Sequence, residues 1–192
     1  MNYFFRKVLK PYIISNRYKN ICEIGASEGD NTEKLLKIKG LCITIIDPCI
    51  DKDLVAHYRS KDCVKIMKGN SLTMLPRIHA PFDCMLIDGD HNWYTVFNEL
   101  TAIHKRGLLK KGGTIFLHDM LWPCARRDQY YVPETIPAEF RHPHAKKGVG
   151  RHETGLLDKG GANPHIYNAC FEGGPRNGVL TAVEDFLKEF WK

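Results

Sequence analysis

The chain has 192 residues, of which 43% are hydrophobic and 26% are charged, and its formal net charge is +6. This composition is typical of one globular domain and excludes disordered and fibrous proteins. The longest uncharged apolar run, residues 41–46, is too short to cross a bilayer, and the N-terminus does not resemble a signal peptide. We therefore predict a cytoplasmic protein without a membrane partner. The scattered lysines and arginines disfavour nucleic acid as a partner.

Five short apolar runs predict strands, at residues 20–25, 41–47, 64–69, 82–88 and 113–119. Such runs are typical of strands that are buried on both faces of a parallel sheet. Helical periodicity separates them at residues 31–39 and 93–109, and the second of these helices is expected to end at the cations and glycines of residues 110–113. This alternation predicts an α/β fold with a doubly wound, mostly parallel, Rossmann-like sheet.

The segment from residue 120 to residue 177 is rich in proline, glycine and histidine. We predict an irregular insertion with one short helix near residues 137–140, followed by an amphipathic helix at residues 179–191. One domain would then cover residues 1–192, with a core at 1–119, the insertion or lid at 120–177 and a C-terminal helix at 178–192. The lid would supply the acceptor pocket, for which the candidates are Arg126, Arg127, Tyr130 and Tyr131.

Cysteines and histidines in this insertion raise the alternative of a zinc site, but their spacing matches no standard zinc pattern. The residues concerned are Cys124, His142, His144, His152, His165 and Cys170. The chain contains no C-x-x-C pair, and its seven cysteines are expected to be reduced and mostly structural.

A glycine-containing turn follows the first predicted strand. Gly25 and Gly29 let the backbone approach a ligand closely, and the helix that follows offers free N–H groups. The spacing lacks the middle glycine of the dinucleotide motif, which favours a nucleoside without phosphates and disfavours a nicotinamide-dependent oxidoreductase. Asp47 ends the second strand, where an acid can accept hydrogen bonds from ribose hydroxyls. The alternative is that it only ends a strand at a turn.

Five short motifs follow one another along the chain. They are Glu23-x-Gly25-x-x-x-Gly29, Ile46-Asp47-Pro48, Gly69-Asn70-Ser71, Ile87-Asp88-Gly89-Asp90-His91 and Leu109-x-x-Gly-Gly-x-Ile-x-x-His118-Asp119. In this order they resemble the motifs of class I S-adenosylmethionine (SAM)-dependent methyltransferases. The last two are similar to those of macrocin-type small-molecule O-methyltransferases, methyltransferase family 24, and the resemblance covers about residues 18–120.

The resemblance implies a SAM site and assigns roles within it. Glu23 would lie near the amino-acid part of SAM, Asp47 would hold the ribose hydroxyls, and Asp88 would face the methionine end. The remaining residues implied to line the cofactor are Gly25, Ala26, Ser27 and Gly29, with Asn70 and Ser71 beside the adenine.

Methyl transfer to a hydroxyl requires alignment of the two reactants and loss of a proton to a base or a metal-activated group. The fourth and fifth strands end at Asp88 and His118-Asp119, so these side chains are expected to meet at one crevice. Asp88 and Asp119 are candidate ligands for Mg²⁺, although Met120 occupies the position of a third oxygen ligand in related enzymes. Without a metal, His91 or His118 is the candidate base, and a structural role for both is the alternative.

The resemblance favours an O-methyltransferase that acts on a small hydroxylated acceptor, such as a sugar or a glycosylated metabolite. The alternative is a non-catalytic module that holds SAM or a partner protein. Class I methyltransferases usually end with two further strands, which have no counterpart before Lys192. We therefore expect either a fragment or a fifth strand left at the sheet edge, where a homodimer could form.

Overall fold

The computed structural model describes residues 1–191, so Lys192, with which the predicted domain ends, lies outside the described residues. The chain forms two compact units. The first unit contains Met1–Gly89 and Ala102–His118, and the second contains Asp90–Thr101 and the residues from Asp119 onward. Within the described residues, we find no helix that combines the length and the apolar character needed to span a membrane.

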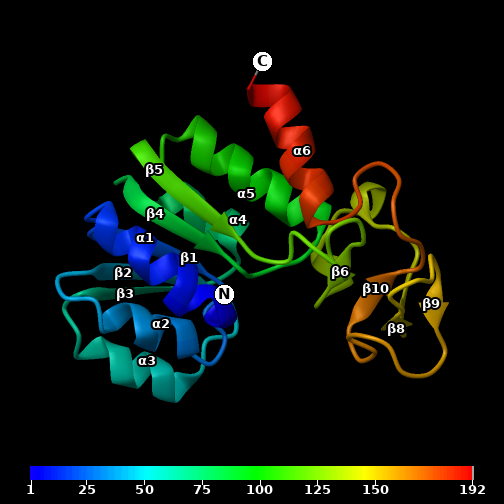
Figure 1. Cartoon of the computed structure of the whole chain (residues 1–192), viewed down its shortest axis with the longest axis horizontal. Helices are drawn as coiled ribbons and strands as arrows, with labels where there is room; N and C mark the ends of the chain where they lie inside the picture. Colours follow the sequence, from blue (N-terminus) through cyan, green and yellow to red (C-terminus); the bar gives the residue numbers. More distant parts are fainter. Residues whose placement is uncertain (192) are drawn as a thin grey trace. The chain divides into compact units, whose positions relative to one another are not determined.

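The first unit contains a sheet of five parallel strands in the order β3-β2-β1-β4-β5 (Figure 1). The strands are β1 (Asn20–Ile24), β2 (Cys42–Asp47), β3 (Val64–Lys68), β4 (Phe82–Ile87) and β5 (Leu109–Leu117). This topology confirms the predicted doubly wound α/β fold. The order reverses between β1 and β4, and ligands bind at the carboxyl ends of the strands beside such a reversal. In the described sheet β5 pairs only with β4, and the homodimer expected at this edge stays a prediction.

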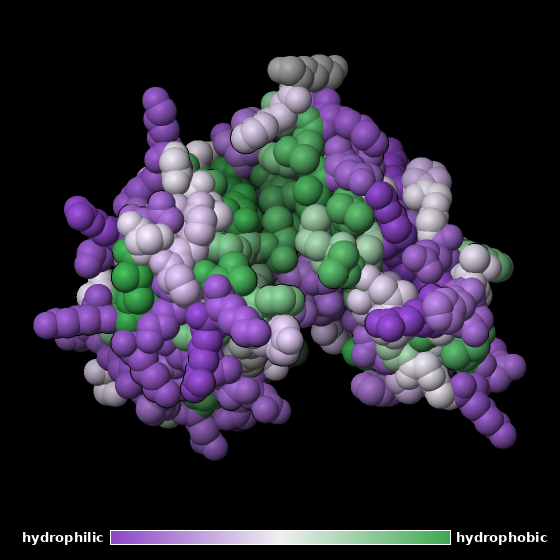
Figure 2. All heavy atoms as spheres, in the orientation of Figure 1, coloured by the Kyte–Doolittle hydropathy of each residue, from purple (hydrophilic) through white to green (hydrophobic). Residues whose placement is uncertain are grey.

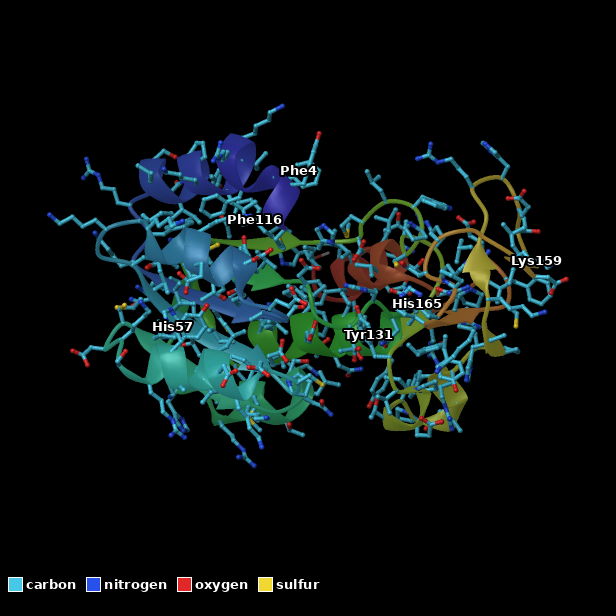
Figure 3. All side chains as sticks on the ribbon, turned by 90° about the horizontal axis from the view of Figure 1, so that it is seen from below. Phe4, His57, Phe116, Tyr131, Lys159 and His165 are labelled. Carbon is cyan, nitrogen blue, oxygen red and sulfur yellow. The ribbon has the colours of Figure 1, made fainter. Side chains whose placement is uncertain are left out.

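Helices of the first unit cover the sheet and contribute to its core. Between the strands lie α2 (Asp30–Leu36), α3 (Lys52–Arg59), α4 (Ser71–Met74) and η3 (Leu75–Arg77). Before β1 the chain forms η1 (Asn2–Phe4), η2 (Phe5–Leu9) and α1 (Lys10–Ser15), which the sequence analysis did not predict. Phe5, Leu9 and Ile13 recur every four residues and are buried in the core with residues of β1, β2 and β4. Phe116 of β5, labelled in Figure 3, meets Tyr12 edge-on at 5.4 Å between ring centroids.

The helix expected at residues 93–109 is shorter than predicted. α5 spans Trp93–Lys105, and Gly107, with φ +63°, supplies the left-handed residue that commonly follows a helix. Lys110 to Gly113 therefore lie in β5, which begins at Leu109, and they do not cap the helix. The cations and glycines of this segment resemble a helix end in sequence, but Leu109 pairs with Phe82 across the sheet.

The insertion of the second unit contains short strands where the sequence analysis predicted irregular structure. β6 (Gln129–Tyr130), β10 (Tyr167–Ala169) and β7 (His144–Lys146) form an antiparallel sheet in this order, and β8 (Gly148–Val149) pairs with β9 (Leu156–Leu157). The short helix predicted near residues 137–140 is the 3₁₀ helix η5 (Ala138–Phe140), and a second one, η4 (Pro133–Thr135), was not predicted. Strands of two or three residues are shorter than the period-2 window by which a strand is predicted from sequence.

The predicted C-terminal helix is α6 (Val179–Phe190). Val179 and Ala182 are buried, whereas Leu187 is exposed. In Figure 2 the helix shows an apolar side and a hydrophilic side, as its amphipathic sequence predicts. Arg126 binds Glu184 on this helix through two hydrogen bonds of 2.6 Å each.

Asp128 joins the N-termini of two helices in the second unit. Its Oδ1 accepts hydrogen bonds from the backbone N–H groups of Trp93 (2.6 Å), at the start of α5, and Gly178 (2.7 Å), which precedes α6. Its Oδ2 accepts one from the hydroxyl of Tyr130 at 2.9 Å. Burial raises the pKa of Asp128, and these donors oppose that shift by stabilising the charged form. A buried carboxylate without these donors would be costly, so the side chain and the two helix ends depend on each other.

We expect Asp128→Asn to destabilise the protein by about 2 kcal/mol or more. The asparagine side chain replaces one acceptor oxygen with an NH₂ donor, so at least one of the buried groups that donate to Asp128 loses its acceptor. Denaturant unfolding measures this loss. Asp158→Asn is the matched control, since the Asp158 side chain is 86% exposed beside Lys147 and its loss should leave the unfolding midpoint nearly unchanged. Equal effects of the two substitutions would contradict this account of Asp128.

Candidate cofactor and catalytic site

The turn after β1 lies against the tip of β4. Gly25 has φ +83°, and a Cβ atom at this position would lie 2.3 Å from the backbone oxygen of Asp88 and 2.5 Å from the Cα of Gly89. A side chain is excluded both by this contact and by the backbone conformation. The amide of Gly25 donates to the carbonyl of Ile46 on β2 at 2.9 Å. Gly25 therefore brings three neighbouring strand tips into backbone contact.

Asp47 holds this turn in place. Its Oδ2 accepts hydrogen bonds from the amides of Ala26 (2.9 Å) and Ser27 (3.0 Å), and its Oδ1 accepts one from the amide of Cys49 (2.7 Å). Ser27 has φ +51°, in the left-handed region that a residue other than glycine adopts uncommonly. The sequence analysis did not predict these backbone contacts. An aspartate at the end of a second strand can bind either a ribose or the neighbouring backbone, and the sequence does not distinguish the two. An ionised carboxylate offers about four acceptor sites, so roughly one remains for a ligand.

Glu23 lies beneath the turn and is 2% exposed. It accepts hydrogen bonds from Asn31 Nδ2 (2.6 Å) and Thr32 Oγ1 (2.5 Å), both in the first turn of α2. Burial raises the pKa of Glu23, while the hydrogen bonds from Thr32 and Asn31 oppose this shift. The carboxylate thus ties the end of β1 to the start of α2, and it does so with both of its oxygens.

The other predicted cofactor residues lie at starts of helices. Gly29, with φ +82°, is the N-cap residue of α2. Asn70 precedes α4, and its carbonyl accepts from the amides of Thr73 and Met74, each at 3.0 Å. The Asn70 residue is exposed and its side chain makes no capping bond, whereas Ser71 is buried. The side-chain carboxamide of Asn70 is therefore exposed at the carboxyl end of β3, where it could contact a ligand.

Asp88 and His118 follow the neighbouring strands β4 and β5 and lie close together, as predicted. Oδ1 of Asp88 is 3.2 Å from Nδ1 of His118. Its Oδ2 accepts a hydrogen bond from the ammonium group of Met1 at 2.9 Å. The amide of His118 donates to the carbonyl of Ile87 at 3.0 Å, so the strand ladder fixes the position of the histidine backbone.

His91 and Asp119 form another pair, in the second unit. Nε2 of His91 lies 2.9 Å from Oδ2 of Asp119, and the thiol of the buried Cys124 lies within 4.8 Å of both ligand atoms. The predicted convergence of Asp88 with Asp119 joins residues of different units and stays a prediction.

Asp88 is a poor fit to the predicted Mg²⁺ site. Mg²⁺ prefers six oxygen ligands, several of them water. One Asp88 oxygen faces an ammonium group and the other faces an imidazole nitrogen. Met120, directly after Asp119, offers no oxygen in its side chain. These residues do not fit a Mg²⁺ ion, and we derive no step through one.

Residues 22–120, more than half of the chain, match a family model described as a methyltransferase domain. The chain belongs to methyltransferase family 24. This match coincides with the segment that carries the five sequence motifs and ends one residue beyond Asp119. The family predicted from the sequence is therefore confirmed. Its members are class I, SAM-dependent methyltransferases.

Two solved structures support the fold of this family 24 domain. A provisionally assigned caffeoyl-CoA O-methyltransferase of Staphylococcus aureus is 22% identical with a TM-score of 0.50, and the match covers 60% of this chain and 56% of that one. A provisionally assigned methyltransferase, yhhF, of Escherichia coli is 12% identical with a TM-score of 0.52, and the match covers 88% and 85%. The chain thus spans a little over half the length of the S. aureus protein. No curated protein matches the chain.

The predicted acceptor-pocket residues of this family 24 domain have mainly structural contacts. Arg127 is buried and donates to the carbonyls of Ala169 and Thr154. Tyr130 is buried beside Asp128, and Arg126 binds α6. Tyr131 is 51% exposed, and its ring lies 5.9 Å from that of His91. Among the described residues, no group that could hold a metal includes a histidine of the zinc alternative, and His142 contacts the carbonyl of Arg176 while His144 contacts that of His142.

Gly25→Ala should abolish the increase in melting temperature that S-adenosylhomocysteine (SAH) gives to the wild-type protein, because the methyl group would meet backbone atoms of β4. Thermal unfolding with and without SAH measures this. Gly112→Ala is the matched control, since Gly112 has a similar φ of +78° with no atom within 4 Å of its Cβ position. Both variants bear the backbone strain of about 1–2 kcal/mol, but only Gly25→Ala should lose the response to SAH. A Gly25→Ala variant with a normal response would refute the close approach.

Proposed function

We propose that the chain binds SAM at the carboxyl edge of β1, β2 and β4 and transfers its methyl group to a hydroxyl oxygen of a small acceptor, such as a sugar or a glycosylated metabolite. The observation that carries this proposal is the glycine turn at Gly25, which is pinned to β2 by Asp47. Its rigid backbone lies at the sheet position where α/β proteins bind nucleosides. The match to methyltransferase family 24 over residues 22–120 supports SAM as the nucleoside.

Three side chains at this edge have the chemistry that SAM requires. Asp47 retains an acceptor site for a ribose hydroxyl, and the exposed Asn70 amide can both donate to and accept from an adenine edge. Asp88 would accept the α-ammonium group of the methionine part. In the structure, its Oδ2 accepts a hydrogen bond from the ammonium group of Met1 at 2.9 Å. SAM would have to displace that contact.

His118 is the base that we propose for an acceptor hydroxyl. SAM supplies an electrophilic methyl group on a positively charged sulfur when it is bound. A nearby Asp88 oxygen, 3.2 Å from Nδ1, favours the proton on that ring nitrogen. Nε2 would then take the proton of the acceptor hydroxyl while the hydroxyl oxygen bonds to the methyl group, whose bond to the SAM sulfur breaks to leave neutral SAH. Asp88 acts on the reaction through the ring of His118 and is a positioning residue in this step.

A non-catalytic SAM-binding module is the second candidate. The contacts that favour it are internal: both Glu23 oxygens have donors from α2, and Asp47 has three amide donors. The turn is therefore stable without a ligand, and its geometry alone does not require turnover. Methyl transfer separates the two candidates.

We expect methyl-labelled SAM to transfer its label to at least one member of a panel of monosaccharides, nucleotide-linked sugars and glycosides. His118→Asn should reduce this transfer by about 100-fold or more while the affinity for SAH changes less than twofold. His57→Asn is the control, because His57 (Figure 3) lies exposed on α3 beside Glu33 and has no proposed role.

Full transfer by His118→Asn would exclude it as the base. Labelling of nitrogen or carbon would exclude O-methylation. SAH binding without transfer to any member of the panel would favour the non-catalytic module.

A further inference from the structure

A histidine, an aspartate and a cysteine converge in the second unit, and the methyl transfer proposed at His118 uses none of them. One ligand atom from each of His91, Asp119 and Cys124 lies within 4.8 Å of the other two. They offer an imidazole nitrogen, a carboxylate oxygen and a thiol sulfur. We propose that these three side chains bind a Zn²⁺ ion, with a fourth position left for water or another oxygen ligand.

Gln129 orients His91 for such a role. Nε2 of Gln129 donates to Oδ1 of Asn168 at 3.2 Å, which directs its Oε1 toward Nδ1 of His91 at 3.3 Å. Since an amide oxygen only accepts, Nδ1 of His91 carries the proton in this hydrogen bond. Histidines that bind metals commonly donate through the other ring nitrogen in this way. Nε2 is therefore the atom that His91 turns toward Asp119.

The short contact between His91 and Asp119 calls for a cation. Nε2 of the neutral tautomer and Oδ2 of Asp119 both carry lone pairs, and they lie 2.9 Å apart. A cation has to join them, either a second ring proton or a metal ion. The sulfur of Cys124, which also donates to Oε1 of Gln129 at 3.9 Å, lies beside the same two atoms. It favours a metal, because it is a strong zinc ligand as thiolate.

The backbone near the three residues makes defined contacts. The amide of Gln129 donates to the carbonyl of His91 at 3.0 Å. Asp119 has φ +54°, in the left-handed region that aspartate adopts more readily than most residues. Cys124 is 2% exposed, and its carbonyl accepts from the amide of Val179 at the start of α6. The ring of Tyr131, labelled in Figure 3, lies 5.9 Å from that of His91.

The ligand types select zinc over magnesium. Nitrogen and thiolate ligands suit Zn²⁺, whereas Mg²⁺ takes carboxylates, carbonyls and water. Binding releases the thiol proton of Cys124 to the solvent as the sulfur–zinc bond forms, so charge and atoms balance without a redox partner. This site differs from the Mg²⁺ pair predicted from sequence, because Asp88 has no part in it.

The test is titration of the purified full chain with Co²⁺, followed by displacement with Zn²⁺ and metal analysis. Co²⁺ bound by a thiolate gives a strong near-ultraviolet charge-transfer absorption. We expect one equivalent per chain with this absorption, full displacement by Zn²⁺ and none by excess Mg²⁺. Cys124→Ser should remove the absorption and weaken Zn²⁺ binding tenfold or more. Cys170→Ser, which changes another thiol of the same unit, should leave both unchanged.

Two further variants keep the result decisive if Cys124→Ser does not fold. Asp119→Asn should weaken Zn²⁺ binding tenfold or more, and Asp88→Asn should leave it unchanged. Absence of a thiolate absorption in the wild-type protein, its persistence in Cys124→Ser, or its loss in Asp88→Asn would each overturn the proposal. None of these results depends on SAM binding, so they are separate from a failure of the proposed methyltransferase activity.

Discussion

The hydrogen bonds from the amides of Ala26 and Ser27 to the carboxylate of Asp47 are the interaction on which the cofactor edge depends. Neighbouring parallel strands meet at their carboxyl ends, but their loops could diverge from there. Asp47 prevents this by drawing the turn after β1 toward β2. Gly25 completes the arrangement, since the absence of a side chain lets the same turn contact the tip of β4. A narrow, preformed edge results, which lowers the entropy lost when a nucleoside binds.

The second unit depends on a comparable carboxylate. Asp128 fixes the starts of α5 and α6. The neighbouring segment then carries Cys124 and Gln129, which lie beside His91. Each unit therefore uses a buried aspartate to bind backbone amides and so places reactive side chains nearby. In both units, a carboxylate accepts hydrogen bonds from backbone N–H groups that have no partner within a helix or strand. These bonds hold segments with little regular secondary structure in defined positions.

Strands that are buried on both faces are predicted well from this sequence, because short runs of β-branched residues such as Ile43–Ile46 favour a buried strand over a helix or a loop. The N-terminal helices were missed because Pro11 and several aromatics obscure the four-residue repeat of their buried side. The end of α5 was misplaced because Lys110 to Gly113 resemble a helix end but extend β5. The strands of the insertion are too short for any periodicity, and only pairing in the folded chain defines them.

For the site, the predicted adjacency of the fourth and fifth strands is confirmed, and Asp88 and His118 at their ends lie 3.2 Å apart. The predicted convergence of the carboxylates of Asp88 and Asp119 stays a prediction. The internal hydrogen-bond partners of Asp47 and Glu23 could not be predicted. Every residue but proline has a backbone N–H group, so the sequence does not indicate which of them bind Asp47, and the side chains that bind Glu23 match no motif. The sequence suggested Cys124 only as part of the zinc alternative in the insertion. Its convergence with His91 could not be predicted, because the two residues are far apart in the chain and match no standard ligand spacing. Side chains that act through long-range contacts need the fold before they can be recognised.

Calorimetric titration of SAH into the wild-type protein, Asp47→Ala and Asp51→Ala tests the central claim most directly. Asp51 is the matched control. Like Asp47, its carboxylate accepts a hydrogen bond from a backbone amide, that of Asp53 at the start of α3. Unlike Asp47, it does not contact the glycine turn. The account predicts that wild type and Asp51→Ala bind SAH with similar affinity and that Asp47→Ala binds at least tenfold more weakly, about 1.4 kcal/mol. Equal affinity of all three proteins, or no binding by a folded wild-type protein, would contradict it.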